Sequence, residues 1–309
     1  MTKYAIQRFI SMVLVIFIIA TATFFLMRVI PGGPFSREKK VPPQVLKNLE
    51  RRYNLDWPLW KQYADYMWNL ARGDLGPSFR YQGRTVNSII KDGFPVSATL
   101  GFMAVCLALL IGIPAGVISA LNQNKWQDNL AMMGSIIGVS IPSFVLAVIM
   151  IYVFGLKLGW LPTAMWGRPS QAIMPAIALA LGPTAVIARL MRSTMLEVIQ
   201  QDYIKTARAK GLPQRLVIYR HALKNALIPV VTFLGPYVAA VFTGSFVIER
   251  MFAIPGLGRY YVNSIYNRDY TVALGVTIFY SALLVFMNFV VDITYAWLDP
   301  RIQLTEGGD

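Results

Sequence analysis

Charged residues divide the sequence into long apolar stretches and shorter polar segments. Six intervals contain no Asp, Glu, Lys or Arg, and each is long enough for the roughly 20 residues that an α-helix needs to cross a bilayer. The intervals are Phe9–Met27, Gly93–Asn124, Asn129–Leu156, Pro169–Ala188, Asn225–Ile248 and Tyr270–Val291. This pattern predicts an all-α integral membrane protein with six transmembrane helices.

The distribution of Lys and Arg between the polar segments predicts the orientation of these helices. Short cytoplasmic loops carry an excess of basic residues. The most basic short segment is 189–224, and placing the N-terminus inside puts this segment in the cytoplasm. The segment 28–91 is too long for the rule, which holds for loops of up to about 60 residues. Both termini are therefore predicted to be cytoplasmic.

The polar segment after the first apolar interval has an organisation of its own. Val45, Leu49 and Tyr53 recur every fourth residue, and Pro58 precedes a second amphipathic stretch that ends near Leu70. These patterns predict two short helices in a small external insert. The sequence thus divides into an N-terminal tail and first helix (1–30), an extracytoplasmic insert (31–95) and a five-helix core (96–309).

Composition supports a membrane protein and excludes several other classes. Of the residues, 56% are hydrophobic and 14% are charged, with a mean hydropathy of +0.51, which is too apolar for a soluble domain of 309 residues. The net charge of +14 could indicate nucleic acid binding, but the basic residues are spread between the apolar intervals, so no nucleic acid partner is predicted. The single cysteine, Cys106, excludes an internal disulfide.

The basic segment 189–224 and its flanks have the pattern of two amphipathic helices with a break between them. Gly211 is suited to end the first helix, and Pro213 is suited to begin the second. Apolar residues three or four positions apart define one face of each helix. They are Leu196, Ile199, Tyr203 and Ala207 in the first helix, and Leu216, Tyr219, Leu223 and Leu227 in the second.

The break in this segment offers a surface with little side chain. Ala207 and Gly211 are four residues apart, so they share a helix face on which a partner could approach the backbone closely. Lys205, Arg208 and Lys210 add positive charge around that face. The segment is predicted to be either such a contact surface or an ordinary basic loop that only fixes the topology.

The run Tyr203-Ile204-Lys205-Thr206-Ala207-Arg208-Ala209-Lys210-Gly211-Leu212 resembles the EAA loop of ABC importer permeases, in the version found in the peptide branch. Lys205 and Thr206 stand where the general pattern has Glu and Ala. In that family the loop, here about 192–226, forms a coupling helix that docks in a groove of the ATPase subunit. The resemblance implies a coupling role for nine residues: Tyr203, Lys205, Thr206, Ala207, Arg208, Ala209, Lys210, Gly211 and Leu212.

Further motifs extend this resemblance over nearly the whole sequence. They are His221–Pro229, Thr243–Glu249, Pro255–Gly258, Asn267–Tyr270 and Tyr295–Arg301. Together they resemble the B-type permease subunit of an oligopeptide importer in a bacterial inner membrane, and Gly76–Phe79 and Phe94–Ala98 favour oligopeptides over dipeptides. Dipeptide, glutathione and nickel permeases are similar and remain the alternatives.

This resemblance implies a set of partners. They are a second homologous permease subunit, two cytoplasmic ATPases that bind ATP and Mg²⁺, and an extracytoplasmic peptide-binding protein. In the family the external insert lies near the docked binding protein. The Tyr and Trp residues of the insert therefore have two interpretations, which are contact with peptide and an aromatic belt at the membrane interface.

Four residues are candidates for a gate or for the translocation pathway. Glu249 precedes a loop in which Pro255 and Gly256 favour a turn, which could close the external side or simply connect two helices. Asp292 is an acid within an apolar interval, and such carboxylates are candidate functional sites. Pairing of Asp292 with a cation such as Arg189 is the alternative.

No catalytic, cofactor or metal site is predicted for this chain. The sequence contains no Gly-x-x-x-x-Gly-Lys-Ser/Thr motif, so ATP hydrolysis is assigned to partner subunits. His221 is the single histidine and has no metal-binding motif around it. A self-sufficient carrier is a distant alternative, because the apolar intervals lack paired acids and a clear internal repeat.

Overall fold

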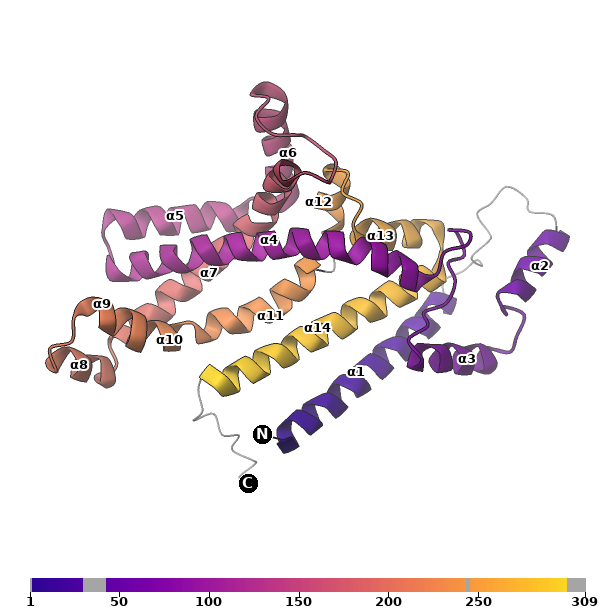
Figure 1. Ribbon diagram of the computed structural model, residues 1–309, viewed down its shortest axis with the longest axis horizontal. Coiled ribbons are helices and arrows are strands. Elements are labelled where there is room, and N and C mark those ends of the chain that lie inside the picture. Colours follow the sequence, from indigo (N-terminus) through magenta and orange to yellow (C-terminus); the bar gives the residue numbers. More distant parts are fainter. Residues whose placement is uncertain (1, 30–42, 243–244, 299–309) are drawn as a thin grey trace. The chain divides into compact units, whose positions relative to one another are not determined.

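The computed structural model describes residues 2–29, 43–242 and 245–298, and these are built from helices joined by loops (Figure 1). They divide into two compact units. Unit 1 comprises Met1–Pro95 and Gly256–Leu283, and unit 2 comprises Val96–Pro255 and Leu284–Asp309. Thr243, Gly244 and the motif residues Asp299–Arg301 lie outside the described residues.

The helices confirm the predicted transmembrane architecture. Within the described residues, five helical stretches are long and apolar enough to cross a membrane, and the number is six when a bent pair is counted as one span. Their main helices are α1 (Thr2–Val29), α4 (Val86–Leu121), α7 (Pro169–Ile199), α11 (Ile228–Phe242) with α12 (Phe246–Met251), and α14 (Tyr270–Leu298). The fold is therefore that of an all-α integral membrane protein.

The bent pair corresponds to the third predicted interval. Helix α5 (Trp126–Ser140) is followed by α6 (Ser143–Met150) and the π-helix η1 (Ile151–Lys157), and the two halves meet at an angle of 98°. The bend falls at Pro142, which has no N–H to donate, and at Ile141, which precedes the proline and has an extended backbone. Pro175 and Pro183, in contrast, lie inside α7, which remains one continuous helix.

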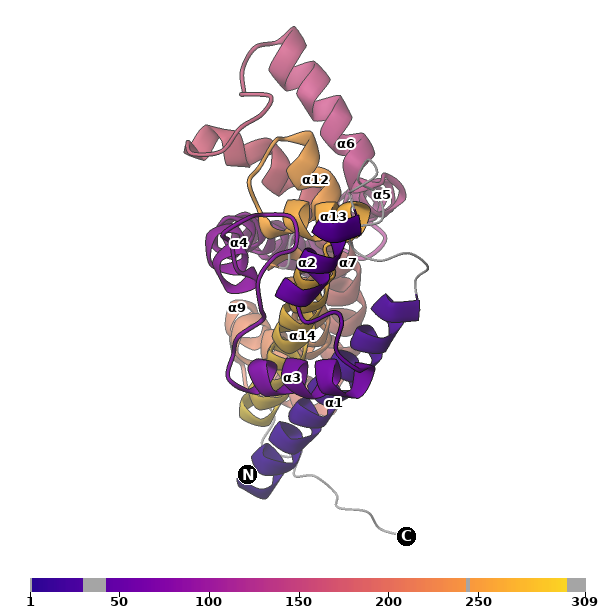
Figure 2. The ribbon, with the colours of Figure 1, turned by 90° about the vertical axis from the view of Figure 1, so that its right-hand side faces the viewer.

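In unit 1, two short helices follow α1 in the chain, as the sequence predicts. These are α2 (Pro43–Arg52) and α3 (Leu59–Ala71), and α3 lies beside the second half of α1 in both Figure 1 and Figure 2. Helices α1 and α3 are joined by a hydrogen bond of 2.7 Å between the hydroxyls of Thr21 and Tyr63. The buried ring of Phe24 also stacks on Tyr66, with 5.3 Å between ring centroids.

A loop from 72 to 85 connects α3 to α4, and Asp269 fixes it in place. The Asp269 carboxylate is fully buried and accepts hydrogen bonds from the Ser78 hydroxyl, from the backbone N–H of Phe79 at 3.1 Å and from the Thr271 hydroxyl at 3.0 Å. Asp269 lies between α13 (Leu257–Asn267) and α14. This carboxylate thus joins two parts of unit 1 that are far apart in the sequence.

In unit 2, glycines allow α4 and α5 to pack closely on α7. A Cβ atom added at Gly116 would lie 2.5 Å from the Ala188 carbonyl oxygen, and one at Gly112 would lie 2.9 Å from the carbonyl oxygen of Thr184. On α5, Gly138 is similarly close to α7, whereas Gly134 has open space around it. These four glycines form two Gly-x-x-x-Gly pairs. Three of them, Gly112, Gly116 and Gly138, allow close helix packing.

Candidate functional site

The predicted coupling segment forms a helical hairpin at the end of α7. Helix α8 (Asp202–Ala209) begins after Gln201, whose extended backbone interrupts the course of α7. The short helix α9 (Gln214–Leu216), the π-helix η2 (Val217–Ala222) and α10 (Leu223–Ala226) then lead back toward α11. Figure 1 shows these elements gathered at one end of α7.

The turn between α8 and α9 confirms the predicted break. Gly211 has a φ of +74°, in the left-handed region that glycine adopts without strain, and its N–H donates to the Arg208 carbonyl at 2.9 Å. Pro213 then precedes α9, where its missing N–H costs no helical hydrogen bond. Gly211 and Lys210 are both exposed, so the turn projects its backbone into the surroundings.

The contact face that Ala207 was predicted to share with Gly211 was wrong. The apolar stripe is confirmed for Leu196, Ile199 and Ala207, which pack in the core of unit 2, but not for Tyr203, which is 43% exposed. Ala207 is only 6% exposed and, with the fully buried Ile204, packs into the core of unit 2. These two residues are three positions apart and define the inner face of α8. The outer face instead carries Tyr203, Lys205, Thr206, Arg208, Ala209 and Lys210, all of which are exposed. Gly211 is therefore the small residue that is exposed in this segment, and Ala207 anchors α8 in the core.

The predicted stripe on the second helix was wrong for Leu216 and Tyr219. It is confirmed for Leu223 and Leu227, which are partly buried and pack against the core of unit 2. Tyr219 is 69% exposed and Leu216 is 36% exposed, whereas Val217, Ile218 and Ala222 are buried. The π-helix explains the difference, because its wider turn departs from the 3.6-residue period on which the prediction relied. The two adjacent apolar residues Val217 and Ile218 could have indicated from the sequence which side of this segment is buried.

Polar contacts hold the outer face of α8. The Asn225 side-chain N–H donates to the Tyr203 hydroxyl at 2.7 Å, which joins α8 to α10. Within α8, Lys205 Nζ donates to the Asp202 carboxylate at 2.9 Å, and this contact lowers the pKa of Asp202. Leu212 is partly buried and packs against the core of unit 2, so it anchors the turn from its other end.

An ion pair joins α7, shortly before the hairpin, to the buried Asp128 of α5. Arg192 donates two hydrogen bonds to Asp128, from Nε to Oδ1 at 2.7 Å and from Nη2 to Oδ2 at 2.8 Å. The same carboxylate accepts from the Ser119 hydroxyl and from the Asn124 N–H at 2.9 Å. This cluster joins the end of α4, the start of α5 and α7. The sequence did not reveal it, because Asp128 stands at the edge of an apolar interval and its partner is far away in the chain.

The candidate gate residues lie in different environments. Glu249 is fully buried in α12 and accepts a hydrogen bond of 2.7 Å from the Ser97 hydroxyl. Pro255 is exposed, and Gly256 is buried at the N-terminus of α13. Asp292 belongs to α14, but its side chain lies outside the described residues. The gate function of these four residues stays a prediction.

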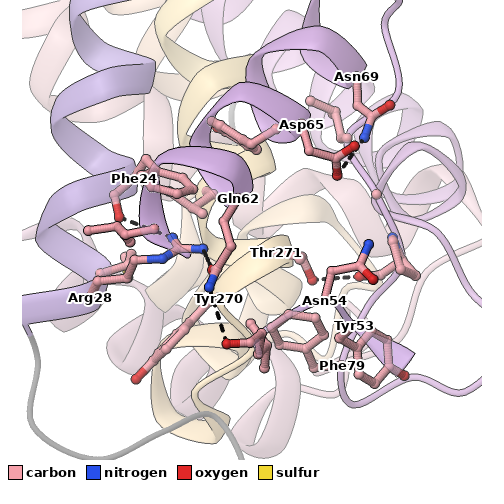
Figure 3. A pocket seen from close by; sticks show the side chains of 18 of the residues that line it. Phe24, Arg28, Tyr53, Asn54, Gln62, Asp65, Asn69, Phe79, Tyr270 and Thr271 are labelled. Atoms are coloured by element: carbon pink, nitrogen blue, oxygen red, sulfur yellow. Dashed lines mark hydrogen bonds between the residues drawn. The ribbon is translucent and has the colours of Figure 1, made fainter. Parts of the chain in front are cut away.

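Unit 1 contains a cavity of about 710 Å³ (Figure 3). Its walls come from the end of α1, from α2 and α3, from the loop that follows α3 and from the start of α14. Of the aromatic residues noted in the insert, Tyr53 and Tyr66 line it. Arg28 and Gln62 also line it, and sequence reasoning missed both, because no pattern indicates that α1 and α3 bring them together.

Two family profiles cover most of the chain. The profile described as "Binding-protein-dependent transport system inner membrane component" matches residues 112–304, and the corresponding N-terminal profile matches residues 1–101. The chain belongs to this family. As an inner membrane component of a binding-protein-dependent transport system, it is a multi-pass protein of the inner membrane.

Relatives of this inner membrane component match along their full length. The chain is 49% identical to the "Dipeptide transport system permease protein DppB" of Bacillus subtilis, with 100% of both chains covered. It is 46% identical to the "Oligopeptide transport system permease protein OppB" of Salmonella typhimurium, with 98% of this chain and 100% of the relative covered. The resemblance to the permeases of the peptide branch is thereby confirmed.

Solved structures of transporters share the fold. An inward-facing structure of the MetNI methionine ABC transporter is 20% identical and has a TM-score of 0.55, covering 68% of this chain and 96% of that chain. An amino acid ABC transporter with histidines is 16% identical, has a TM-score of 0.50 and covers 67% of this chain and 93% of that chain. The helical arrangement of this inner membrane component is thus that of ABC transporter permeases.

Proposed function

We propose that this chain is the permease subunit of an ATP-driven importer of oligopeptides. It forms half of the translocation pathway and receives its driving force through the hairpin of α8 and η2. The names of the relatives, which are peptide transport permeases, support peptides as the substrate class. The oligopeptide assignment rests on the motifs Gly76–Phe79 and Phe94–Ala98.

The observation that carries this proposal is the two-sided construction of α8. Its inner face, with Ile204 and Ala207, is buried against the rest of unit 2. Its outer face presents Lys205, Arg208 and Lys210 next to the open turn at Gly211. A partner that pulls or pushes on this outer face moves a helix that is anchored in the transmembrane core. A subunit that does not hydrolyse ATP itself requires such a contact, through which movement of a partner reaches its transmembrane helices.

The proposed assembly draws on the resemblance to permeases of ABC importers and on the distribution of basic residues along the chain. Both termini and the hairpin face the cytoplasm, where two ATPase subunits bind the hairpin of this chain and that of a second, homologous permease subunit. The insert (31–95) faces the other side, where a peptide-binding protein docks. ATP-driven closure of the ATPases moves the hairpin, and the transmembrane core (96–309) switches between outward-open and inward-open states.

Substitution of Gly211 tests the coupling role. A Cβ atom at Gly211 would meet nothing within 4 Å, so a large side chain has room in this chain itself. Gly211→Trp and Gly211→Ala both carry the left-handed strain of about 1–2 kcal/mol, whereas Gly211→Asn tolerates that conformation better. We expect peptide uptake to be lost only in the Trp variant, because only its bulk blocks a partner.

Uptake and assembly are measured in the complete transporter. The Trp variant should insert normally in the membrane but support little peptide-stimulated ATP hydrolysis. Equal uptake by the Trp and Asn variants would refute docking at this turn. Competition of a labelled tripeptide to pentapeptide series against dipeptides, glutathione and Ni²⁺ separates the oligopeptide proposal from its alternatives. Preference for any of those three competitors would refute the oligopeptide assignment.

A further inference from the structure

The cavity in unit 1 contains an arginine at the end of a transmembrane helix. Arg28 lies in the last turn of the apolar span Phe9–Val29 and lines the cavity of about 710 Å³. The end of a span lies at the depth of the lipid headgroups, where Arg and aromatic residues concentrate. Figure 3 shows the Arg28 side chain running along one wall of the cavity, beside Phe24.

The Arg28 guanidinium is held in one orientation. Its Cζ lies 3.5 Å from the centroid of the Phe24 ring, and its Nη2 donates to the Gln62 Oε1 at 2.7 Å. The Gln62 amide is itself fixed, because its Nε2 donates to the backbone oxygens of Leu55 at 3.2 Å and Trp57 at 2.8 Å. The guanidinium is therefore preorganised, which reduces the entropy that a ligand must overcome on binding.

This cation lacks an anionic partner within the described part of the chain. Among the described residues, its hydrogen-bond acceptors are neutral oxygens, namely the Gln62 amide and the Phe24 carbonyl at 3.3 Å. A guanidinium has five N–H donors, so several remain for a ligand. Arginine suits carboxylate and phosphate groups, which it binds with two parallel hydrogen bonds. An anion in the cavity would compensate a partly buried charge.

Other parts of the cavity carry acidic and apolar side chains, together with a second arginine, Arg52. Asp65 lies on a different side of the cavity from Arg28 (Figure 3), and its carboxylate accepts a hydrogen bond of 3.3 Å from the Asn69 amide. Among the described residues, no Lys or Arg forms an ion pair with Asp65. Leu59 and Leu274 supply apolar surface in the same cavity.

We propose that this cavity is a binding site for the headgroup of a zwitterionic phospholipid such as phosphatidylethanolamine. The phosphate binds Arg28, the ammonium lies toward Asp65, and the start of the acyl chains contacts the apolar lining. A lipid fits better than a peptide because Arg28 ends a transmembrane span, at the depth where membrane phosphates are concentrated. The residues of this site differ from those of the hairpin. The lipid proposal therefore holds whether or not the chain imports oligopeptides.

The test measures lipid that remains bound to the purified complex. The complete transporter is delipidated in detergent, and retained phospholipid is quantified by mass spectrometry for the wild type, Arg28→Gln and Arg72→Gln. Arg72 is the matched control, because it is an exposed arginine over the Trp68 ring and does not line the cavity. Arg28→Gln should retain about tenfold less phosphatidylethanolamine, as expected for loss of charge-assisted hydrogen bonds, whereas Arg72→Gln should match the wild type.

Two further variants test the roles of Asp65 and Arg28 in lipid binding. Asp65→Asn should shift the retained lipid from phosphatidylethanolamine toward phosphatidylglycerol, because it removes the partner of the ammonium but not that of the phosphate. If Arg28→Gln does not assemble, Arg28→Lys serves instead, since it keeps the charge but loses the two-fold hydrogen bonding and should retain less lipid. Equal retention by Arg28 variants and wild type, or displacement of the lipid by a free peptide, would overturn the proposal.

Discussion

Arg192→Met would break the ion pair that lies on α7 shortly before the hairpin of α8 and η2. Methionine keeps the length of the side chain and removes its charge, so the Asp128 carboxylate would keep only its hydrogen bonds from Ser119 and Asn124. The Asp128 side chain is 3% exposed and that of Arg192 is 25% exposed. A buried carboxylate that loses its cation is strongly destabilising.

The size of this effect follows from the burial of the pair. Removing one partner of a fully buried ion pair costs about 3–5 kcal/mol. Because Arg192 is a quarter exposed, water can partly replace it, and we expect a loss at or below the lower limit of that range, about 2–3 kcal/mol. The double variant Asp128→Asn/Arg192→Met leaves no unpaired charge and should lose less than Arg192→Met alone.

The assay is a double-mutant cycle on the purified transporter. The midpoint of thermal unfolding is measured for the wild type, Asp128→Asn, Arg192→Met and the double variant, with all other components constant. Transport per ATP hydrolysed is recorded for each variant, since α7 leads directly from Arg192 to the hairpin. Additive effects of the two single substitutions would refute the reasoning, because they would show that the two side chains do not stabilise each other.

Three further predictions concern packing and burial. Gly116→Ala should destabilise the chain, because its Cβ would lie 2.5 Å from α7 atoms, whereas Gly134→Ala should have no measurable effect on thermal unfolding. Asp269→Asn should loosen the loop around Ser78, measured as faster proteolysis or hydrogen exchange there. Burial raises the pKa of Tyr66 above its ordinary value of 10.0, so its contribution to stability is lost as the pH rises above that value. Tyr66→Phe should reduce the loss of thermal stability at alkaline pH. An unchanged loss would show that ionisation of Tyr66 does not cause it.

The sequence predicts the parts of the fold that depend on local patterns. The apolar intervals correspond to the helical spans, and the four-residue spacing after Pro43 and Pro58 corresponds to α2 and α3. The break at Gly211 and Pro213 was also predictable, because each residue has a strong backbone preference. Such signals act within a few residues and require no knowledge of the tertiary structure.

Features that depend on distant contacts or irregular helices were beyond this reasoning. The π-helix at Val217–Ala222 changes which side chains are buried, and a regular period cannot show it. Ala207 has the same small side chain whether it faces a partner or the core, so its burial depends on the packing of α8. The contacts of Arg28 with Gln62 and of Asp128 with Arg192 join separate helices, and neither sequence segment reveals the other.

Cross-linking from the hairpin of α8 and η2 tests most directly whether this segment contacts an ATPase subunit. In a chain that carries Cys106→Ser and Lys210→Cys, the single thiol lies at the exposed turn beside Gly211. A short thiol-reactive cross-linker applied to membranes with the complete transporter should join this residue to an ATPase subunit, with a yield that changes on ATP binding. Reaction of this thiol from the external side of intact cells, without any adduct to an ATPase, would contradict the account.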